Sequence, residues 1–196
     1  KHVLLFSVLF FLSGCFQSKQ TRYTDLIQKE NIQCRHTMPV IVLDPGHGNF
    51  DLGTHNEHCE EKVLSLNTAL YVKAELVKKG YRVVMTRSRD EFVPLKKRAQ
   101  IANDLKSQVL VSIHYNAALN KKAHGIEIFY PKKAKPWRQK RSKLLAQTIL
   151  RKMLVNTGAN SRGIKEGNLC VIRESNMPSV LVECGFITNE KECKKM

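Results

Sequence analysis

Short apolar runs alternate with helical apolar stripes along most of this chain. The apolar runs predict strands at residues 40–43, 81–86, 109–114, 125–130, 169–172 and 180–183. Apolar residues at helical spacing predict helices at 60–79, 94–105 and 140–155. This alternation predicts a single α/β domain over residues 39–196, with a twisted, mostly parallel or mixed sheet flanked by helices. The chain stops where another helix is expected to begin, so we expect a C-terminal helix that is cut short.

The first residues are typical of an export signal. In the ten residues 3–12 only Ser7 is polar, which is long enough for a signal peptide and too short to span a bilayer. The following Leu12-Ser13-Gly14-Cys15 resembles the lipobox of bacterial lipoproteins, in which the cysteine is lipidated. We therefore expect a signal peptide at 1–14 and a lipidated, polar tether at 15–38. A plain secretory leader with a chance cysteine is the alternative.

These features predict an exported protein, anchored by lipid to a bacterial membrane and facing the periplasm or the cell wall. In such an oxidising compartment two of the remaining cysteines can form a disulfide, but their spacing does not indicate which pair. The candidates are Cys34, Cys59, Cys170, Cys184 and Cys193.

The charge of the chain favours an anionic partner. It has 33 Lys and Arg against 17 Asp and Glu, a formal net charge of +16. Export and the lack of a recognition motif argue against nucleic acid. Residues 132–143 contain seven basic residues and no acidic one. This segment is either a solvated face or a surface that attracts peptidoglycan or an anionic membrane.

Three side chains at the ends of expected elements are candidate metal ligands. His47 follows the first strand, Glu61 begins the first helix and His114 ends the strand 109–114. Two histidines and a carboxylate leave a fourth position for water, which is typical of catalytic zinc. Each also has a structural interpretation, because strand-end histidines form hydrogen bonds and a first-turn glutamate complements the helix dipole. A second group, His55, Glu57, His58 and Cys59, lacks the HExxH spacing.

Eight short motifs occur in one order between residues 39 and 192. They are Asp44-Pro45-Gly46-His47-Gly48, Glu61-Lys62, Thr86-Arg87, Arg98 with Ala102-Asn103, Ser112-Ile113-His114-Tyr115-Asn116, Gly125-Ile126-Glu127, Arg162-Gly163 and Leu181-Val182-Glu183-Cys184-Gly185-Phe186. This ordered set is similar to the zinc-dependent N-acetylmuramoyl-L-alanine amidases (amidase type 3), which hydrolyse the bacterial cell wall. The resemblance covers nearly the whole expected domain.

The resemblance implies a ligand set, a catalytic base and a reaction. The zinc ligands of the family fall on His47, Glu61 and His114, and its essential glutamate falls on Glu183. The implied reaction cleaves the amide between N-acetylmuramic acid and L-alanine in peptidoglycan, with Glu183 moving the proton. Asn116 and Glu127 are expected to contact a ligand histidine or the substrate.

Other interpretations of these residues remain open. A zinc peptidase acting within the stem peptide would use the same metal chemistry, and a lipoprotein that binds the wall without catalysis would not. Arg98 is expected to have a structural role, pairing with the end of a helix or strand. No pattern in the chain indicates a protein partner or the preferred stem peptide.

Overall fold

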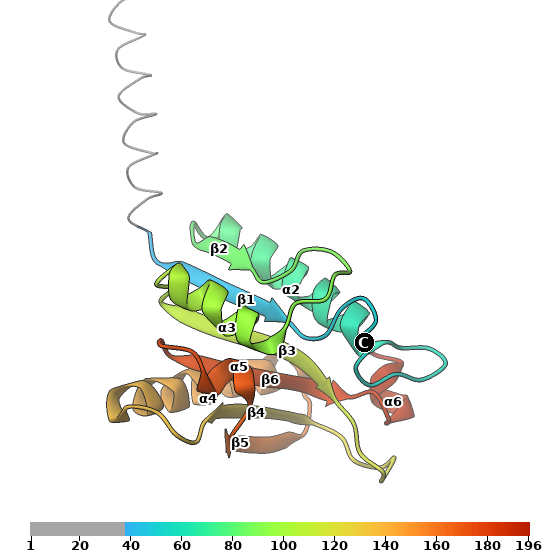
Figure 1. Ribbon diagram of the computed structural model, residues 1–196. Helices are drawn as coiled ribbons and strands as arrows, with labels where there is room; N and C mark the ends of the chain where they lie inside the picture. The colour runs from blue at the N-terminus through green and yellow to red at the C-terminus, as the bar shows by residue number, and fades with distance from the viewer. Residues whose placement is uncertain (1–37) are drawn as a thin grey trace, which may run out of the picture. The chain divides into compact units, whose positions relative to one another are not determined.

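Six strands form one mixed sheet in the order β2-β1-β3-β6-β4-β5 (Figure 1). The computed structural model describes residues 38–196, so the expected signal peptide, Cys15 and Cys34 lie outside the described residues. The strands are β1 (Val40–Pro45), β2 (Arg82–Met85), β3 (Val109–Asn116), β4 (Ile126–Pro131), β5 (Ser161–Gly167) and β6 (Ser179–Phe186). β1 is parallel to β2 and β3, and β3 to β6, whereas β4 is antiparallel to β6 and parallel to β5. The prediction of an α/β domain with a mixed sheet is confirmed.

Helices cover both faces of the sheet. They are α2 (Glu61–Lys78), α3 (Leu95–Asp104), α4 (Pro136–Thr157), α5 (Cys170–Arg173) and α6 (Glu190–Cys193). α2 packs on β1, β2 and β3, and α4 packs on β4, β5 and β6 of the same face, while α3 and α5 contact each other on the opposite face (Figure 1). No helix within residues 38–196 combines the length and the apolar character needed to cross a membrane.

The alternation of side chains along each strand divides the core between the two faces. Val42 and Leu110 pack with Ala102 of α3 on one face, and Val180 and Val182 pack with α4 on the other. Because both faces of β1, β3 and β6 are covered, these strands are continuous apolar runs. This explains why the sequence predicted them.

Two segments differ from the sequence-based prediction. The segment 169–172, predicted as a strand, instead contains the N-cap Leu169 and most of the short helix α5, because an apolar run of this length suits either structure. β5 was not predicted, since it is an edge strand of largely exposed polar residues. α4 begins at Pro136, one turn before the prediction, with proline in its first turn.

Parallel pairing brings the carboxyl ends of β1, β3 and β6 to one edge of the sheet. Asp44 of β1 lies beside Ser112 of β3, and His114 of β3 lies beside Glu183 of β6. Loops that follow such strand ends form the usual ligand crevice of open α/β sheets. The candidate site residues lie at this edge.

Candidate metal centre and active site

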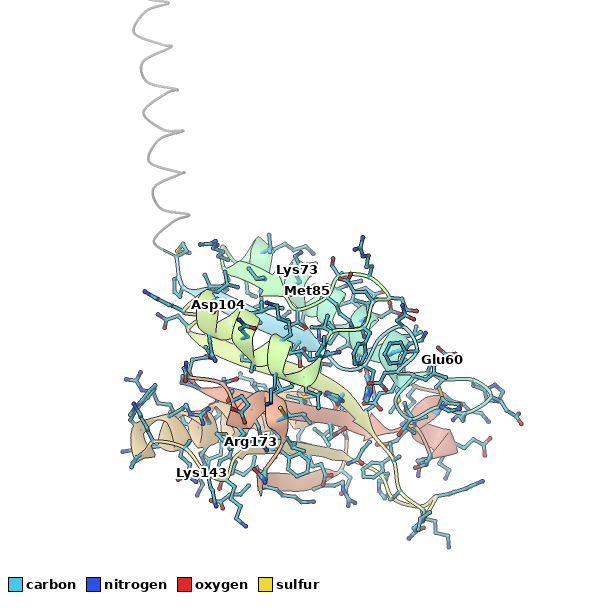
Figure 2. All side chains as sticks on the ribbon, in the orientation of Figure 1. Glu60, Lys73, Met85, Asp104, Lys143 and Arg173 are labelled. Atoms are coloured by element: carbon cyan, nitrogen blue, oxygen red, sulfur yellow. A yellow bond between two sulfur atoms is a disulfide. The ribbon has the colours of Figure 1, made fainter. Side chains whose placement is uncertain are left out.

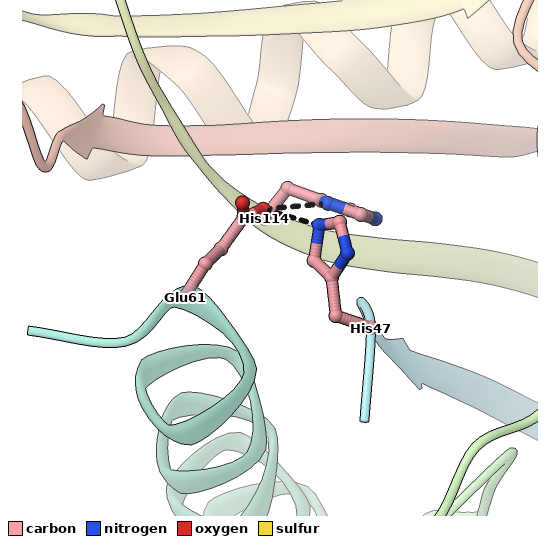
Figure 3. A group of neighbouring side chains, drawn as sticks. All are labelled: His47, Glu61 and His114. Atoms are coloured by element: carbon pink, nitrogen blue, oxygen red, sulfur yellow. Dashed lines mark hydrogen bonds and ion pairs between the residues drawn. The ribbon is translucent and has the colours of Figure 1, made fainter. Parts of the chain in front are cut away.

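His47, Glu61 and His114 converge at this edge from three different elements (Figure 3). His47 lies in the loop after β1, Glu61 is the first residue of α2 and His114 lies near the end of β3. Glu61 Oε1 is 2.8 Å from His114 Nδ1 and 3.0 Å from His47 Nε2. The fold therefore brings together the three residues that the sequence singled out, and they form a group able to hold a metal ion.

The donor set fits zinc. Tetrahedral zinc with bonds of about 2.0 Å spaces its ligand atoms about 3.3 Å apart, close to the distances above. The three ligand atoms all lie within 4.8 Å of one another. Two imidazoles with a single carboxylate suit zinc better than magnesium or calcium, which prefer oxygen ligands. Three protein ligands also leave one position for water or substrate.

Glu61 is held in its charged form. Burial disfavours its charge, but hydrogen bonds and the proximity of His114 and His47 outweigh burial and lower the pKa of Glu61 to about 2. The backbone N–H groups of Thr54 and Tyr115 also donate to its two carboxylate oxygens. A charged carboxylate fixed by both oxygens is ready to bind a cation.

Two buried arginines, which we call the arginine pair (Arg87 and Arg98), fix the loop that presents His47. Arg87 donates to the carbonyls of Pro45 and Gly46 at 3.1 and 2.6 Å. Arg98 donates to the carbonyls of Pro45 and His47 at 2.5 and 2.7 Å. These contacts hold His47 in the left-handed region at φ 60°, which costs free energy for a non-glycine residue.

Asp44 supplies the counter-charge beneath this loop. It is fully buried and accepts hydrogen bonds from Thr86, Ser112 and Arg98 at 2.6, 2.6 and 3.0 Å. The expectation that Arg98 pairs with the end of a strand agrees with this geometry. The network ties β1 and β3 to α3 and to the residue that follows β2.

Two glycines allow the ligand side chains to approach the backbone. A Cβ atom on Gly46 would lie 2.6 Å from His114 Nδ1, and one on Gly53 would lie 2.6 Å from Glu61 Oε2. Real Cβ atoms do not approach other atoms so closely. Gly53 additionally has φ +64°, a conformation that favours glycine.

Asp51 contacts His47 and was not singled out by the sequence. Its Oδ1 lies 2.9 Å from His47 Nδ1, the ring nitrogen that points away from Glu61. Such a carboxylate orients a metal-binding histidine. The sequence predicted that Asn116 and Glu127 contact either a ligand histidine or the substrate, and neither forms a hydrogen bond to His47 or His114 within residues 38–196. The only signal for Asp51 was its position four residues after His47.

Glu183 is partly buried and lies beside His114 in the register of β3 and β6. Its Oε2 has no hydrogen-bond partner among the residues that the structure describes. Burial, with a contribution from the carboxylates of Glu61 and Glu127 and against the effect of His114, raises the pKa of Glu183 to about 7. A buried carboxylate oxygen without a partner is costly, so the position of Glu183 next to the candidate ligand set indicates a chemical role.

Asn116 and Glu127 form a polar group next to Glu183. The Asn116 amide donates to Glu127 Oε1 at 2.5 Å, and Glu127 also pairs with Arg162 and Lys165. Burial opposes the charge of Glu127, but Lys165 and Arg162 together lower its pKa below the ordinary value. Glu127 lies opposite Glu183 in the register of β4 and β6. The pair therefore borders the candidate base.

The loop that precedes Glu61 is tied to the C-terminal helix. Cys59 and Cys193 form a disulfide, which resolves the pairing that the sequence left open. Asn56 of the same loop donates to the carbonyl of Ile187 at 2.9 Å. Cys59 is therefore bonded to α6 and is not a free thiol ligand. Within residues 38–196, the second group of His55, Glu57, His58 and Cys59 does not form a metal-binding cluster.

Comparisons with known proteins agree with this geometry. Residues 41–196 match the family described as N-acetylmuramoyl-L-alanine amidase. The chain is 36% identical over 156 residues to the N-acetylmuramoyl-L-alanine amidase LytC of Bacillus subtilis, covering 80% of this chain and 31% of LytC. This chain spans about a third to a half of the length of curated relatives such as LytC.

Solved structures show the same fold. An N-acetylmuramoyl-L-alanine amidase from Clostridium difficile 630 aligns with a TM-score of 0.76 at 42% identity, covering 81% of this chain and 85% of that one. The catalytic domain of the amidase CwlV from Bacillus (Paenibacillus) polymyxa aligns with a TM-score of 0.72 at 39% identity, covering 79% and 84%. This chain belongs to the N-acetylmuramoyl-L-alanine amidase family.

Proposed function

We propose that this chain hydrolyses the amide bond between N-acetylmuramic acid and L-alanine in peptidoglycan, using zinc held by His47, Glu61 and His114. The observation that carries the proposal is the convergence of this donor set beside Glu183, whose Oε2 is buried and has no hydrogen-bond partner among residues 38–196. The printed names of the relatives, which are N-acetylmuramoyl-L-alanine amidases, support the choice of bond.

The proposed mechanism divides the work between metal and protein. A zinc ion held there would supply a Lewis acid that activates water and polarises the amide carbonyl. Glu183 accepts the proton of the attacking water and delivers it to the leaving amine of L-alanine. Asp51 keeps the His47 ring oriented, and the arginine pair keeps the loop of His47 in place.

Asn116 and Glu127 serve in this proposal as substrate contacts rather than as partners of a ligand histidine. Glu127 lies opposite Glu183 in the sheet and accepts a hydrogen bond from Asn116. Neither Asn116 nor Glu127 forms a hydrogen bond to His47 or His114 within residues 38–196. The cations Arg162 and Lys165 next to Glu127 are suited to a carboxylate of a stem peptide.

The proposal places the enzyme outside the cytoplasm. The relatives include proteins named as probable cell-wall amidases, which supports export and action on the wall. The leader-like residues 1–14, the tether 15–38 and lipidation at Cys15 complete the proposed arrangement, with residues 39–196 as the catalytic domain. Mass spectrometry of the mature protein tests the lipid at Cys15.

Metal analysis and activity test the site together. We expect near-stoichiometric zinc in the intact protein, loss of zinc in His114→Ala, and retention of zinc in Glu183→Gln with turnover reduced about 10²- to 10⁴-fold. Glu174→Gln, an exposed change remote from this edge, is the matched control and should leave both unchanged. Zinc-loaded Glu183→Gln with full turnover would contradict the assigned base.

Product analysis distinguishes the proposed reaction from the other candidates. Digestion of purified peptidoglycan by the amidase releases intact stem peptides with free L-alanine amino groups. A zinc peptidase would instead release shortened peptides, and a protein that only binds the wall would release neither.

A further inference from the structure

The outer face of α4 has an unusual combination of apolar and basic side chains. The residues of α4 that face the sheet recur every four positions, at Arg138, Ser142, Ala146 and Leu150. Trp137, Leu144 and Val155, separated by seven and eleven residues, lie on the opposite side of the helix. They are 48%, 62% and 77% exposed. Three large apolar side chains therefore form one solvent-facing line.

Basic residues flank this line without acidic neighbours. Lys140, Arg141, Arg151 and Lys152 are all exposed, and with Trp137, Leu144 and Val155 they make up the α4 outer face. Arg141 also lies over the Trp137 ring at 5.9 Å. No Asp or Glu occurs between Glu127 and Glu166. None of these four bases forms an ion pair with a carboxylate of residues 38–196.

An open apolar groove lies beside this face. It has a volume of about 470 Å³, and Leu150, Leu154 and Val155 of α4 and Ile164 of β5 contribute to its lining. The exposed apolar surface is thus wider than the line of three side chains. Single exposed apolar residues are common, but three on one face of a helix, next to an apolar groove and flanked by one sign of charge, indicate an interaction surface.

We propose that the α4 outer face docks on the surface of an anionic phospholipid bilayer. Trp, Leu and Val at the centre suit the boundary between headgroups and acyl chains, and the flanking Lys and Arg suit anionic headgroups. Peptidoglycan also carries carboxylates, but it is hydrophilic and offers no apolar layer to cover these three side chains. The proposal is independent of the amidase reaction and of lipidation at Cys15.

The strand directions are compatible with such docking. β4 runs antiparallel to β6, so its end at Pro131 lies at the edge where β1 begins, away from the edge of the metal centre. The basic beginning of α4 follows at this edge, and Lys143 lies on the side of the molecule remote from Glu60 in Figure 2. α4 runs from this edge back toward the edge of the metal centre, because β5 begins at Ser161 beside Ile126. The Trp137 end of the α4 outer face therefore lies far from the metal centre, and the Val155 end lies nearer to it.

Trp137 is the only tryptophan of the chain and reports directly on this contact. The experiment titrates the full chain with phosphatidylglycerol vesicles that contain brominated phosphatidylcholine, and with phosphatidylcholine vesicles. We expect the Trp137 emission to shift to shorter wavelength and to be quenched on the anionic vesicles only. Because the probe is the residue itself, binding through the N-terminus cannot produce the signal.

Two matched triple variants test the role of the flanking bases. Arg141, Arg151 and Lys152 are changed to Gln in one, and the exposed Lys79, Lys96 and Lys97 in the other, so that each lowers the net charge of +16 by three. We expect the first variant to raise the half-saturating lipid concentration on the order of a hundredfold, and the control variant to raise it much less.

Two outcomes would overturn the proposal. Unquenched Trp137 emission in vesicle-bound protein would show that another surface makes the contact. An emission change on purified peptidoglycan sacculi but not on anionic vesicles would assign the α4 outer face to the wall. Neither readout depends on turnover, so failure here is distinguishable from failure of the proposed amidase function.

Discussion

Two sets of positively charged side chains in this protein have opposite surroundings. Arg87 and Arg98 are 1% and 2% exposed and donate to backbone carbonyls, and Arg98 also donates to Asp44. The bases of the α4 outer face are exposed and form no ion pair within residues 38–196. The first set fixes the loop of His47, and the second is free to meet a partner.

The comparison shows how burial decides what a cation does. A buried guanidinium loses its hydration, so its N–H groups must donate to protein acceptors. Where these acceptors are backbone carbonyls, the guanidinium fixes that segment of backbone. An exposed cation keeps its hydration and contributes little to stability. The predictions below test this division, and they run from the largest expected effect to the smallest.

Loss of Arg98 should have the largest effect on stability. Arg98→Ala leaves Asp44 buried with an uncompensated charge, and we expect the free energy of unfolding to fall by about 3–5 kcal/mol in urea titrations. Arg98→Lys should recover only part of this, because one ammonium cannot reach Asp44, Pro45 and His47 together. Lys97→Ala, an exposed change on the same helix, is the control and should stay within about 0.5 kcal/mol. Equal losses of stability in Arg98→Ala and Lys97→Ala would contradict the distinction between buried and exposed cations.

Gly46→Ala tests whether the arginine pair fixes the position of the loop that carries Gly46 and His47. The added Cβ would meet the His114 ring while Arg87 holds the Gly46 carbonyl, so the loop cannot retreat. We expect a loss of about 1–3 kcal/mol in the free energy of unfolding and a clear loss of zinc affinity by competition with a chelator. Gly158→Ala adds a Cβ that meets nothing within 4 Å and should leave zinc affinity unchanged. Unchanged zinc binding by Gly46→Ala would mean that the loop is not held.

Glu127 is an intermediate case, since its carboxylate is buried and its partners Arg162 and Lys165 are half exposed. Its folded-state pKa lies below the ordinary value of 4.5. Its ionised form therefore contributes stability that is fully present above the unfolded pKa and is lost as pH falls through the folded pKa. The unfolding free energies of the unaltered chain and Glu127→Gln should differ most near pH 6 and converge below pH 4. A difference that is constant from pH 6 to pH 3 would exclude this ionic contribution.

The bases of α4 should matter least for stability. We expect Arg151→Gln and Lys152→Gln to change the free energy of unfolding by less than about 0.5 kcal/mol in urea titrations. The same changes should weaken binding to anionic vesicles. A destabilisation comparable to that of Arg98→Ala would show that these side chains support the fold instead.

The central strands of the sheet could be predicted from the sequence, whereas the polar edge strand β5 could not. β1, β3 and β6 are covered on both faces and carry continuous apolar runs, which predicted them directly. β5 pairs on one side only and has few apolar residues, so it gave no signal. The apolar run at 169–172 was wrongly predicted as a strand because local pattern does not separate a buried strand from a buried helical turn.

The residues that cluster at the candidate site could be named from the sequence, but the contacts that support them could not. His47, Glu61, His114 and Glu183 were identified by resemblance, since their motifs are contiguous in sequence. Arg87 and Arg98 donate largely to backbone carbonyls. Every residue has a backbone carbonyl, so the sequence does not indicate which ones accept these hydrogen bonds. Asp51 was missed for a similar reason, because a single aspartate in a loop has many possible partners.

The sequence by itself determined the α/β alternation, the order of the motifs and the lack of acidic residues between Glu127 and Glu166. Only the tertiary structure decided that Glu61 lies between two histidines, that Cys59 pairs with Cys193, and that Trp137, Leu144 and Val155 face solvent. The physical reason is that these facts depend on strand register and on which helix face is covered. Both are set by packing between segments far apart in the chain, which local residue patterns do not encode.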